Sequence, residues 1–182
     1  MGKLFGTDGI RGVVNAGLDA DLAYKVGLAA AIVLSKDKKP GEKPLVTIGK
    51  DTRISGDLLK GSLIAGLCTA GADVLDLGTL PTPGVAWVTV DEGADAGIVI
   101  SASHNPFEHN GIKIFNGQGF KLSDALEERI EDIILNDKEV PRKTGAEIGR
   151  VVYADAKESQ DYIDHLVSTI STDLSGLKIL VD

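Results

Sequence analysis

Gly97-Ile-Val-Ile-Ser-Ala-Ser-His-Asn-Pro106 is the stretch of this chain that best defines its fold. Its first four residues are a short apolar run of the kind that forms a strand buried on both faces of a sheet. The run leads into a polar segment that ends at Gly111, and Ile112-Lys-Ile-Phe115 predicts a second strand after it. The end of a buried strand therefore delivers a polar loop, as α/β proteins do at their functional edges.

Helices and strands alternate on either side of this stretch. Helical spacing of apolar residues and short apolar runs predict, in order, a helix over 19–36, a strand over 45–48, a helix over 55–70, a strand over 73–77, a helix after Gly84, the two strands already named, a helix after Ser123 and a helix near 163–170. This alternation predicts a layered α/β domain with helices on both faces of the sheet.

The composition excludes several classes of protein. The chain has 182 residues, 43% hydrophobic and 25% charged, as is ordinary for a globular domain. Its net charge of −8 argues against a broad basic surface for nucleic acid. One cysteine, Cys68, allows neither an intrachain disulfide nor a cysteine-based zinc site. No apolar run is long enough to span a membrane and no signal sequence opens the chain, so we expect a cytoplasmic protein without a membrane partner.

The C-terminal residues predict a change of domain. Gly176-Leu-Lys-Ile-Leu-Val-Asp182 has the pattern of a strand and follows a polar turn. It could complete the sheet of the same domain or begin another. We expect residues 1–172 to form one domain, and residues 173–182 to be a linker and the first strand of a second domain that is cut short.

The polar loop after the central strand carries the densest set of functional groups. Ser101 and Ser103 would face the same way if the strand stayed extended, and neighbouring side chains such as those of Ser103 and His104 would diverge. Asn105-Pro106 restricts the backbone directly after them, which suits a serine that must hold one position. A plain surface loop is the alternative, and two histidines alone are weak evidence for a metal site.

Two further loops could bind anions. Phe5-Gly-Thr-Asp-Gly-Ile-Arg-Gly12 combines three glycines, which allow close approach of the backbone, with Arg11, whose planar fork suits a phosphate. Gly49-Lys-Asp-Thr-Arg-Ile-Ser-Gly56 lies between a strand and a helix N-terminus, where Lys50 and Arg53 would favour an anion. An internal ion pair of Asp51 with Arg53 or another cation, together with a Ser55 cap, is an equally good interpretation of the second loop.

Four motifs together resemble the α-D-phosphohexomutase superfamily. They are, in order, the segments 5–12, 49–53, 81–83 and 97–106, which read FGTDGIRG, GKDTR, PTP and GIVISASHNP. The spelling of the first and last is similar to that of the bacterial phosphoglucosamine mutases, one branch of that superfamily. The resemblance implies domain 1 of a four-domain enzyme: a three-layer α/β/α domain with a mixed sheet, in a chain truncated at the start of domain 2.

The resemblance also implies roles for individual residues. Ser103 would be the phosphoserine that exchanges its phosphoryl group with the sugar, with Ser101 as a minor acceptor. Lys113 and Arg11 would lie near the reacting phosphate, and His104 would assist proton transfer. The expected catalytic residues are Ser103, His104, Lys113 and Arg11, and the expected phosphate-binding residues are Thr7, Asp8, Asn105 and Ser101.

The implied reaction converts glucosamine 6-phosphate into glucosamine 1-phosphate for aminosugar and cell-wall precursor synthesis. Glucosamine 1,6-bisphosphate would be the intermediate and activator, and Mg²⁺ the cofactor, bound here only through the phosphate of Ser103. The partners would be the phosphosugar and the remaining domains, and this piece alone would be inactive. The alternatives are a phosphoglucomutase or phosphomannomutase, or a non-catalytic phosphosugar-binding module.

Overall fold

A computed structural model of the chain describes residues 4–36, 38–39 and 41–181. The order of elements is β1 (Ile10–Val13), α1 (Ala20–Ser35), β2 (Leu45–Lys50), α2 (Gly56–Thr69), β3 (Asp73–Thr79), α3 (Thr82–Asp91), β4 (Ala96–Ile100), β5 (His109–Asn116), α4 (Asp124–Leu135), a short 3-10 turn (Gly145–Glu147), β6 (Val151–Tyr153) and α5 (Ala156–Ser168). The predicted alternation of helices and strands is confirmed.

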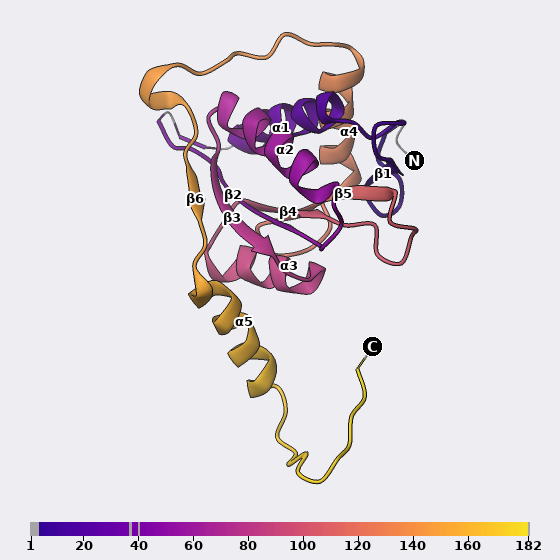
Figure 1. Cartoon of the computed structure of the whole chain (residues 1–182). Coiled ribbons are helices and arrows are strands. Elements are labelled where there is room, and N and C mark those ends of the chain that lie inside the picture. Colours follow the sequence, from indigo (N-terminus) through magenta and orange to yellow (C-terminus); the bar gives the residue numbers. More distant parts are fainter. Residues whose placement is uncertain (1–3, 37, 40, 182) are drawn as a thin grey trace.

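The strands form one mixed sheet in the order β1-β5-β4-β2-β3-β6. β2 pairs in parallel with β3 and β4, and β3 in parallel with β6, whereas β5 runs antiparallel to both β4 and β1. α1, α2 and α4 cover one face of the sheet and α3 covers the other (Figure 1). This is the predicted three-layer α/β/α domain with a mixed sheet.

The core explains why β4, in the middle of the sheet, has no polar side chain. All five residues of β4 are buried, because helices cover the strand on both faces. Ile98 and Ile100 pack under α1 and α2, and Val99 packs under α3. At the start of α1, Asp19 Oδ1 accepts a hydrogen bond from the Leu22 amide at 2.8 Å, which caps the helix.

Two edge strands were not predicted. β1 falls inside the glycine-rich stretch that we interpreted as a phosphate-binding loop, and its Gly12 interrupts the apolar pattern of a strand. β6 has three residues, too few to show a period of two. Both strands form through hydrogen bonds to neighbours that are distant in sequence, a signal that local pattern does not carry.

The strand predicted at the C-terminus does not form in this chain. Residues 176–181 form no strand, and Leu177, Ile179 and Leu180 are exposed; Asp182 lies outside the described residues. A lone strand has no ladder partner and does not persist in water. The division at residue 172 stays a prediction.

The last helix of the chain, α5, lies against α3, where Trp87 and Tyr162 have their ring centroids 5.9 Å apart (Figure 1).

None of the helices in the described part of the chain has both the length and the apolar character that crossing a membrane requires.

The pairing of α1 with α2 depends on two glycines that face each other's backbone. A Cβ at Gly66 would lie 2.1 Å from the Tyr24 carbonyl oxygen, and a Cβ at Gly27 would lie 2.3 Å from that of Leu63. Contacts this short cannot be relieved by turning a side chain, because the opposing atoms belong to the backbone. The two helices therefore approach as closely as they do only with glycine at both positions.

We predict that Gly66→Ala lowers the free energy of unfolding by about 2–3 kcal/mol, because the new methyl group forces α1 and α2 apart. Urea unfolding of the purified chain measures this change. Gly61→Ala is the matched control on α2, since a Cβ there meets nothing within 4 Å. That variant should be stabilised by up to about 1 kcal/mol, as alanine favours a helix over glycine. Equal effects at the two positions would contradict the close-packing explanation.

Candidate active site

The predicted functional loops meet at one edge of the sheet. β2, β3 and β4 are parallel, so their carboxyl ends lie on the same side. Backbone hydrogen bonds join them there, from Asp51 N to Ile100 O at 3.0 Å and from Leu80 N to Lys50 O at 3.1 Å. A shallow hollow of about 350 Å³ opens at this edge, lined by Asp51, Thr52, Thr79, Leu80, Pro81, Thr82 and Ser101.

Residues 101–108 connect β4 to β5 and form what we call the serine loop. The extended strand on which a shared face for the two serines would depend is absent, because β4 ends at Ile100. Ser103 is exposed and has a left-handed backbone with φ of 56°. Ser101 is only 7% exposed, and its Oγ accepts a hydrogen bond from the Ser103 amide at 3.1 Å. The loop thus buries one serine and uses it to orient the other.

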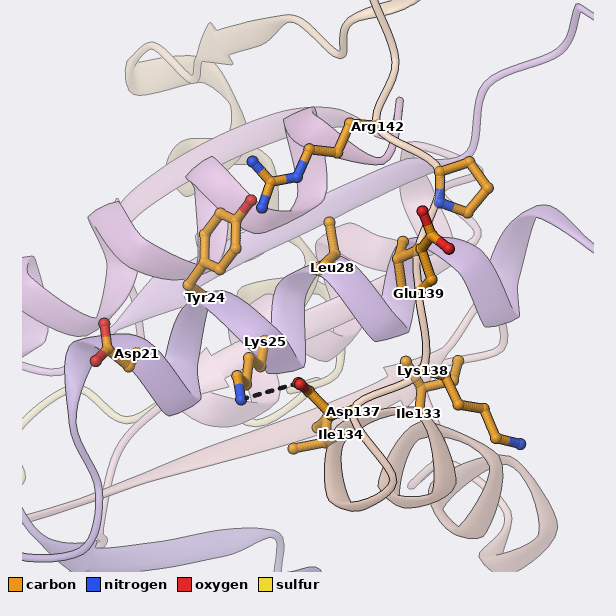
Figure 2. Close-up of a pocket in the computed structure, with 12 residues that line it drawn as sticks. Asp21, Tyr24, Lys25, Leu28, Ile133, Ile134, Asp137, Lys138, Glu139 and Arg142 are labelled. Carbon is orange, nitrogen blue, oxygen red and sulfur yellow. Dashed lines mark hydrogen bonds and ion pairs between the residues drawn. The ribbon is translucent and has the colours of Figure 1, made fainter.

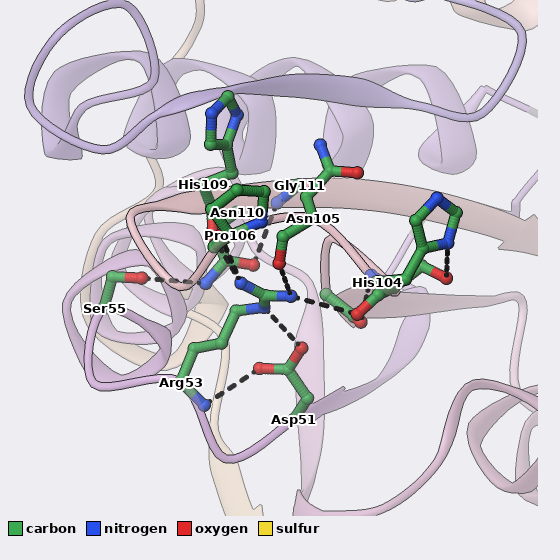
Figure 3. Close-up of polar contacts among 11 residues, drawn as sticks. Asp51, Arg53, Ser55, His104, Asn105, Pro106, His109, Asn110 and Gly111 are labelled. Carbon is green, nitrogen blue, oxygen red and sulfur yellow. Dashed lines mark hydrogen bonds and ion pairs between the residues drawn. The ribbon is translucent and has the colours of Figure 1, made fainter.

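The left-handed turn also brings His104 back to the serine. Ser103 Oγ lies 3.3 Å from His104 Nδ1, so the expectation that these neighbouring side chains diverge is wrong (Figure 3). Divergence follows from an extended backbone, and Ser103 is not extended. An imidazole at this distance can exchange a proton with the serine oxygen, which is what general acid–base assistance needs.

Arg53 does not face an open anion site. Its Nε donates to Asp51 Oδ2 at 3.0 Å, and the rest of its guanidinium reaches backbone carbonyls of the serine loop (Figure 3). Lys50 pairs with Asp57 at 3.3 Å. Of the two interpretations of segment 49–56, the internal ion pair is therefore the correct one. Ser55 makes no side-chain cap, because its Oγ instead accepts a hydrogen bond from Asn110 Nδ2 at 3.0 Å.

A second cluster joins β1 to β5. Asp8 forms ion pairs with both Arg11 and Lys113, the latter at 3.1 Å between Oδ1 and Nζ. Arg11 pairs with Gly111 across the two strands, and the Ser101 amide bonds to the Gly111 carbonyl at 3.0 Å. A Cβ at Gly111 would lie 3.0 Å from Arg11 Cγ and 2.8 Å from the Ser101 carbonyl oxygen. The missing side chain therefore lets the arginine stem cross β5 beside the base of the serine loop.

Thr7 and Asn105 are less closely tied to this arrangement. Thr7 lines a separate hollow of about 230 Å³ with acidic residues of α4 and Lys121. Hydrogen bonding to Glu127 raises the pKa of the Lys121 amine there. Asn105 contributes its backbone carbonyl to Arg53, and its side chain points away from that group (Figure 3).

Sequence reasoning missed two residues that shape the site. Glu131, buried on α4, accepts hydrogen bonds from the Leu4 and Phe5 amides at 2.7 and 2.6 Å and so anchors the stretch that carries Asp8. Asn110 is fully buried and links the start of β5 to Ser55. Glu131 gave no signal, because a carboxylate in an amphipathic helix usually faces water. Asn110 lay in the polar run, and its burial required the fold.

A larger hollow lies elsewhere on the molecule. Figure 2 shows a space of about 800 Å³ between α1 and the segment that follows α4, where Lys25 and Asp137 pair at 3.4 Å. None of its lining residues belongs to the serine loop or to the cluster around Asp8. Across the described residues, no group of three or more His, Cys, Asp or Glu side chains could hold a metal ion.

The fold and these loops define a class: an α/β/α domain that exposes Ser103 in the loop after β4 and holds the cations Arg11 and Lys113 near the base of that loop. The family model for phosphoglucomutase/phosphomannomutase, alpha/beta/alpha domain I, matches residues 2–141. The chain belongs to this family.

Curated relatives and solved structures agree with the assignment. Phosphoglucosamine mutases from Acetivibrio thermocellus and Desulforamulus reducens are 56% and 54% identical over the whole chain. The chain spans about 40% of the length of each. A phosphoglucomutase/phosphomannomutase family protein from Burkholderia thailandensis, 29% identical, superposes with a TM-score of 0.72 over 92% of this chain and 36% of its own.

We predict that Ser103→Gly is more stable than Ser103→Ala by about 1 kcal/mol, because glycine adopts the left-handed conformation without a steric penalty. Urea unfolding of both variants measures the difference. Ser62 in the middle of α2 is the control, since alanine should be more stable than glycine there by a similar amount. The same order at both positions would show that Ser103 is not strained.

Proposed function

We propose that the complete protein is a phosphoglucosamine mutase, which interconverts glucosamine 6-phosphate and glucosamine 1-phosphate. One observation carries the proposal: Ser103 is exposed in a left-handed turn, with its Oγ 3.3 Å from His104 Nδ1. The names of the relatives, at 54–56% identity, support glucosamine as the sugar. Because the chain covers 40% of those relatives, the activity is assigned to the whole protein and not to this part alone.

The proposed chemistry is a pair of phosphoryl transfers through Ser103. In the first, the bond between phosphorus and Ser103 Oγ breaks and a bond to a sugar hydroxyl oxygen forms, giving the 1,6-bisphosphate. The proton of the sugar hydroxyl passes to water, and His104, as the imidazolium, donates a proton to the departing Ser103 Oγ. In the second transfer, the other phosphate of the reoriented bisphosphate passes to Ser103. Positioning and charge neutralisation supply most of the catalysis in such reactions.

The Asp8 cluster would supply part of that neutralisation. A phosphoserine carries about −1.5 to −2 charges at neutral pH. Arg11 and Lys113 oppose it, and Asp8, which pairs with both, orders the two cations relative to each other. Two cations and one carboxylate leave one formal positive charge beside the serine loop. Thr7, Asn105 and Ser101 complete the proposed phosphate-binding set, Ser101 only as a minor acceptor because it is 7% exposed.

Mg²⁺ is the proposed cofactor, but the described residues do not fit it unaided. They include no group of three metal-binding side chains, so this part of the chain would contribute only a phosphoryl oxygen on Ser103. Mg²⁺ prefers oxygen ligands in octahedral geometry and is commonly held by carboxylates together with phosphates.

The decisive experiment is a mutase assay on the complete protein, with glucosamine 6-phosphate and glucose 6-phosphate offered separately. Each of the two assay mixtures contains Mg²⁺ and a trace of the bisphosphate of the same sugar. We expect a clear preference for glucosamine 6-phosphate, and Ser103→Ala should lose activity by at least about a thousandfold because no phosphoenzyme can form.

Near-normal activity of Ser103→Ala would overturn the assignment of the nucleophile. A preference for glucose 6-phosphate would keep the mechanism and change the branch of the family. A folded protein that turns over neither sugar would contradict the proposed function.

A further inference from the structure

Every donor of the Arg53 guanidinium is used inside the protein. Nε donates to Asp51 Oδ2 at 3.0 Å. Nη1 donates to the carbonyl oxygens of Pro106 and His109 at 2.7 and 3.2 Å, and Nη2 to those of Ser103 and Asn105 at 3.0 and 2.9 Å (Figure 3). An arginine has five N–H donors. All five are therefore spent, four of them on the serine loop and its first β5 residue.

Because all of its donors are used, Arg53 is not placed to bind a phosphate. An arginine that binds phosphate must keep at least one edge of its fork free for the anion. Here one edge faces Asp51, whose other oxygen accepts the Arg53 backbone amide at 3.0 Å and so holds both ends of the residue. Binding a phosphate would require breaking bonds to the loop.

The bonds also explain how the loop keeps an unfavourable turn. The left-handed Ser103 has both of its backbone polar groups occupied: the amide by Ser101 Oγ and the carbonyl by Arg53 Nη2. Conformations of this kind persist when the surrounding structure over-determines them. A separate hydrogen bond, from Asn110 Nδ2 to Ser55 Oγ at 3.0 Å, joins the start of β5, just after the loop, to the same segment after β2.

We propose that Arg53 is the positioning residue of the phosphoryl-carrying loop, resting on the proposed function of Ser103. It contacts no substrate and acts through the Ser103 carbonyl, holding Oγ and the attached phosphate where the sugar is presented. Asp51 sets the orientation of the guanidinium. Lysine cannot replace it, because a single ammonium has three donors on one atom and cannot span four carbonyls.

The test is steady-state kinetics of Arg53→Lys in the complete protein, with glucosamine 6-phosphate as substrate. We expect kcat to fall about a hundredfold while KM changes by less than about threefold, since misplacing the reacting group affects turnover more than binding. The control is Arg142→Lys, a change at an exposed arginine that lines the hollow in Figure 2, and it should leave both constants unchanged.

A second readout locates the effect. Hydrogen–deuterium exchange of the peptide covering residues 101–109 should become about tenfold faster in Arg53→Lys, with β2 and β4 unchanged. If that variant fails to fold, Asp51→Asn provides the same test, because its amide retains the size of the carboxylate but removes the charge that orients Arg53. It should lower kcat in the same direction by a smaller factor.

The outcomes separate the two proposals. A rise of about tenfold in KM with kcat retained would show that Arg53 binds the phosphate directly and would overturn the positioning role. Unchanged kcat with a stable fold would overturn it as well. An inactive wild-type protein would contradict the proposed function, and the exchange of the 101–109 peptide would then decide alone whether Arg53 holds the loop.

Discussion

The arrangement of the serine loop depends on a single guanidinium at the carboxyl edge of the sheet. Arg53 joins the segment after β2 to the connection between β4 and β5, and to the first residue of β5, through four hydrogen bonds to carbonyl oxygens. All five of its N–H donors meet acceptors in this geometry of the loop, so a change in the loop's path would break several of these bonds at once. Ser103 can therefore hold a left-handed backbone and remain exposed.

The rest of the fold places two cationic side chains, Arg11 and Lys113, near the base of that loop. β5 turns antiparallel after the serine loop, and β1 pairs with its other edge, so Arg11, Gly111 and Ser101 lie in one row across three chain segments. Parallel pairing throughout would separate these residues. Glycine at 111 leaves room for the arginine stem, and Asp8 holds Arg11 and Lys113 together. In the proposed function the loop carries a phosphate, and cations already held in place at this edge would stabilise its charge.

Sequence pattern predicted the layers, the central strands and the serine loop, because burial on both faces leaves an apolar run and α1 to α4 bury periodic faces. It did not predict β1 or β6, whose pairing is non-local, and it placed a strand at 176–182 on apolar pattern alone. The role of Arg53 stayed open between an anion site and an ion pair. The path of the 101–108 loop around the Arg53 guanidinium decides between the two interpretations. The spacing of residues in the sequence does not predict that path.

The most direct test of this account is to locate the phosphoryl group by tandem mass spectrometry. The complete protein would be incubated with glucosamine 1,6-bisphosphate and digested, and the peptide spanning β4 and the serine loop would be fragmented between its two serines. The account predicts that nearly all of the phosphate is on Ser103, because Ser101 is 7% exposed and its Oγ accepts the Ser103 amide. Phosphate mainly on Ser101 or on another residue, or an unmodified loop, would contradict it.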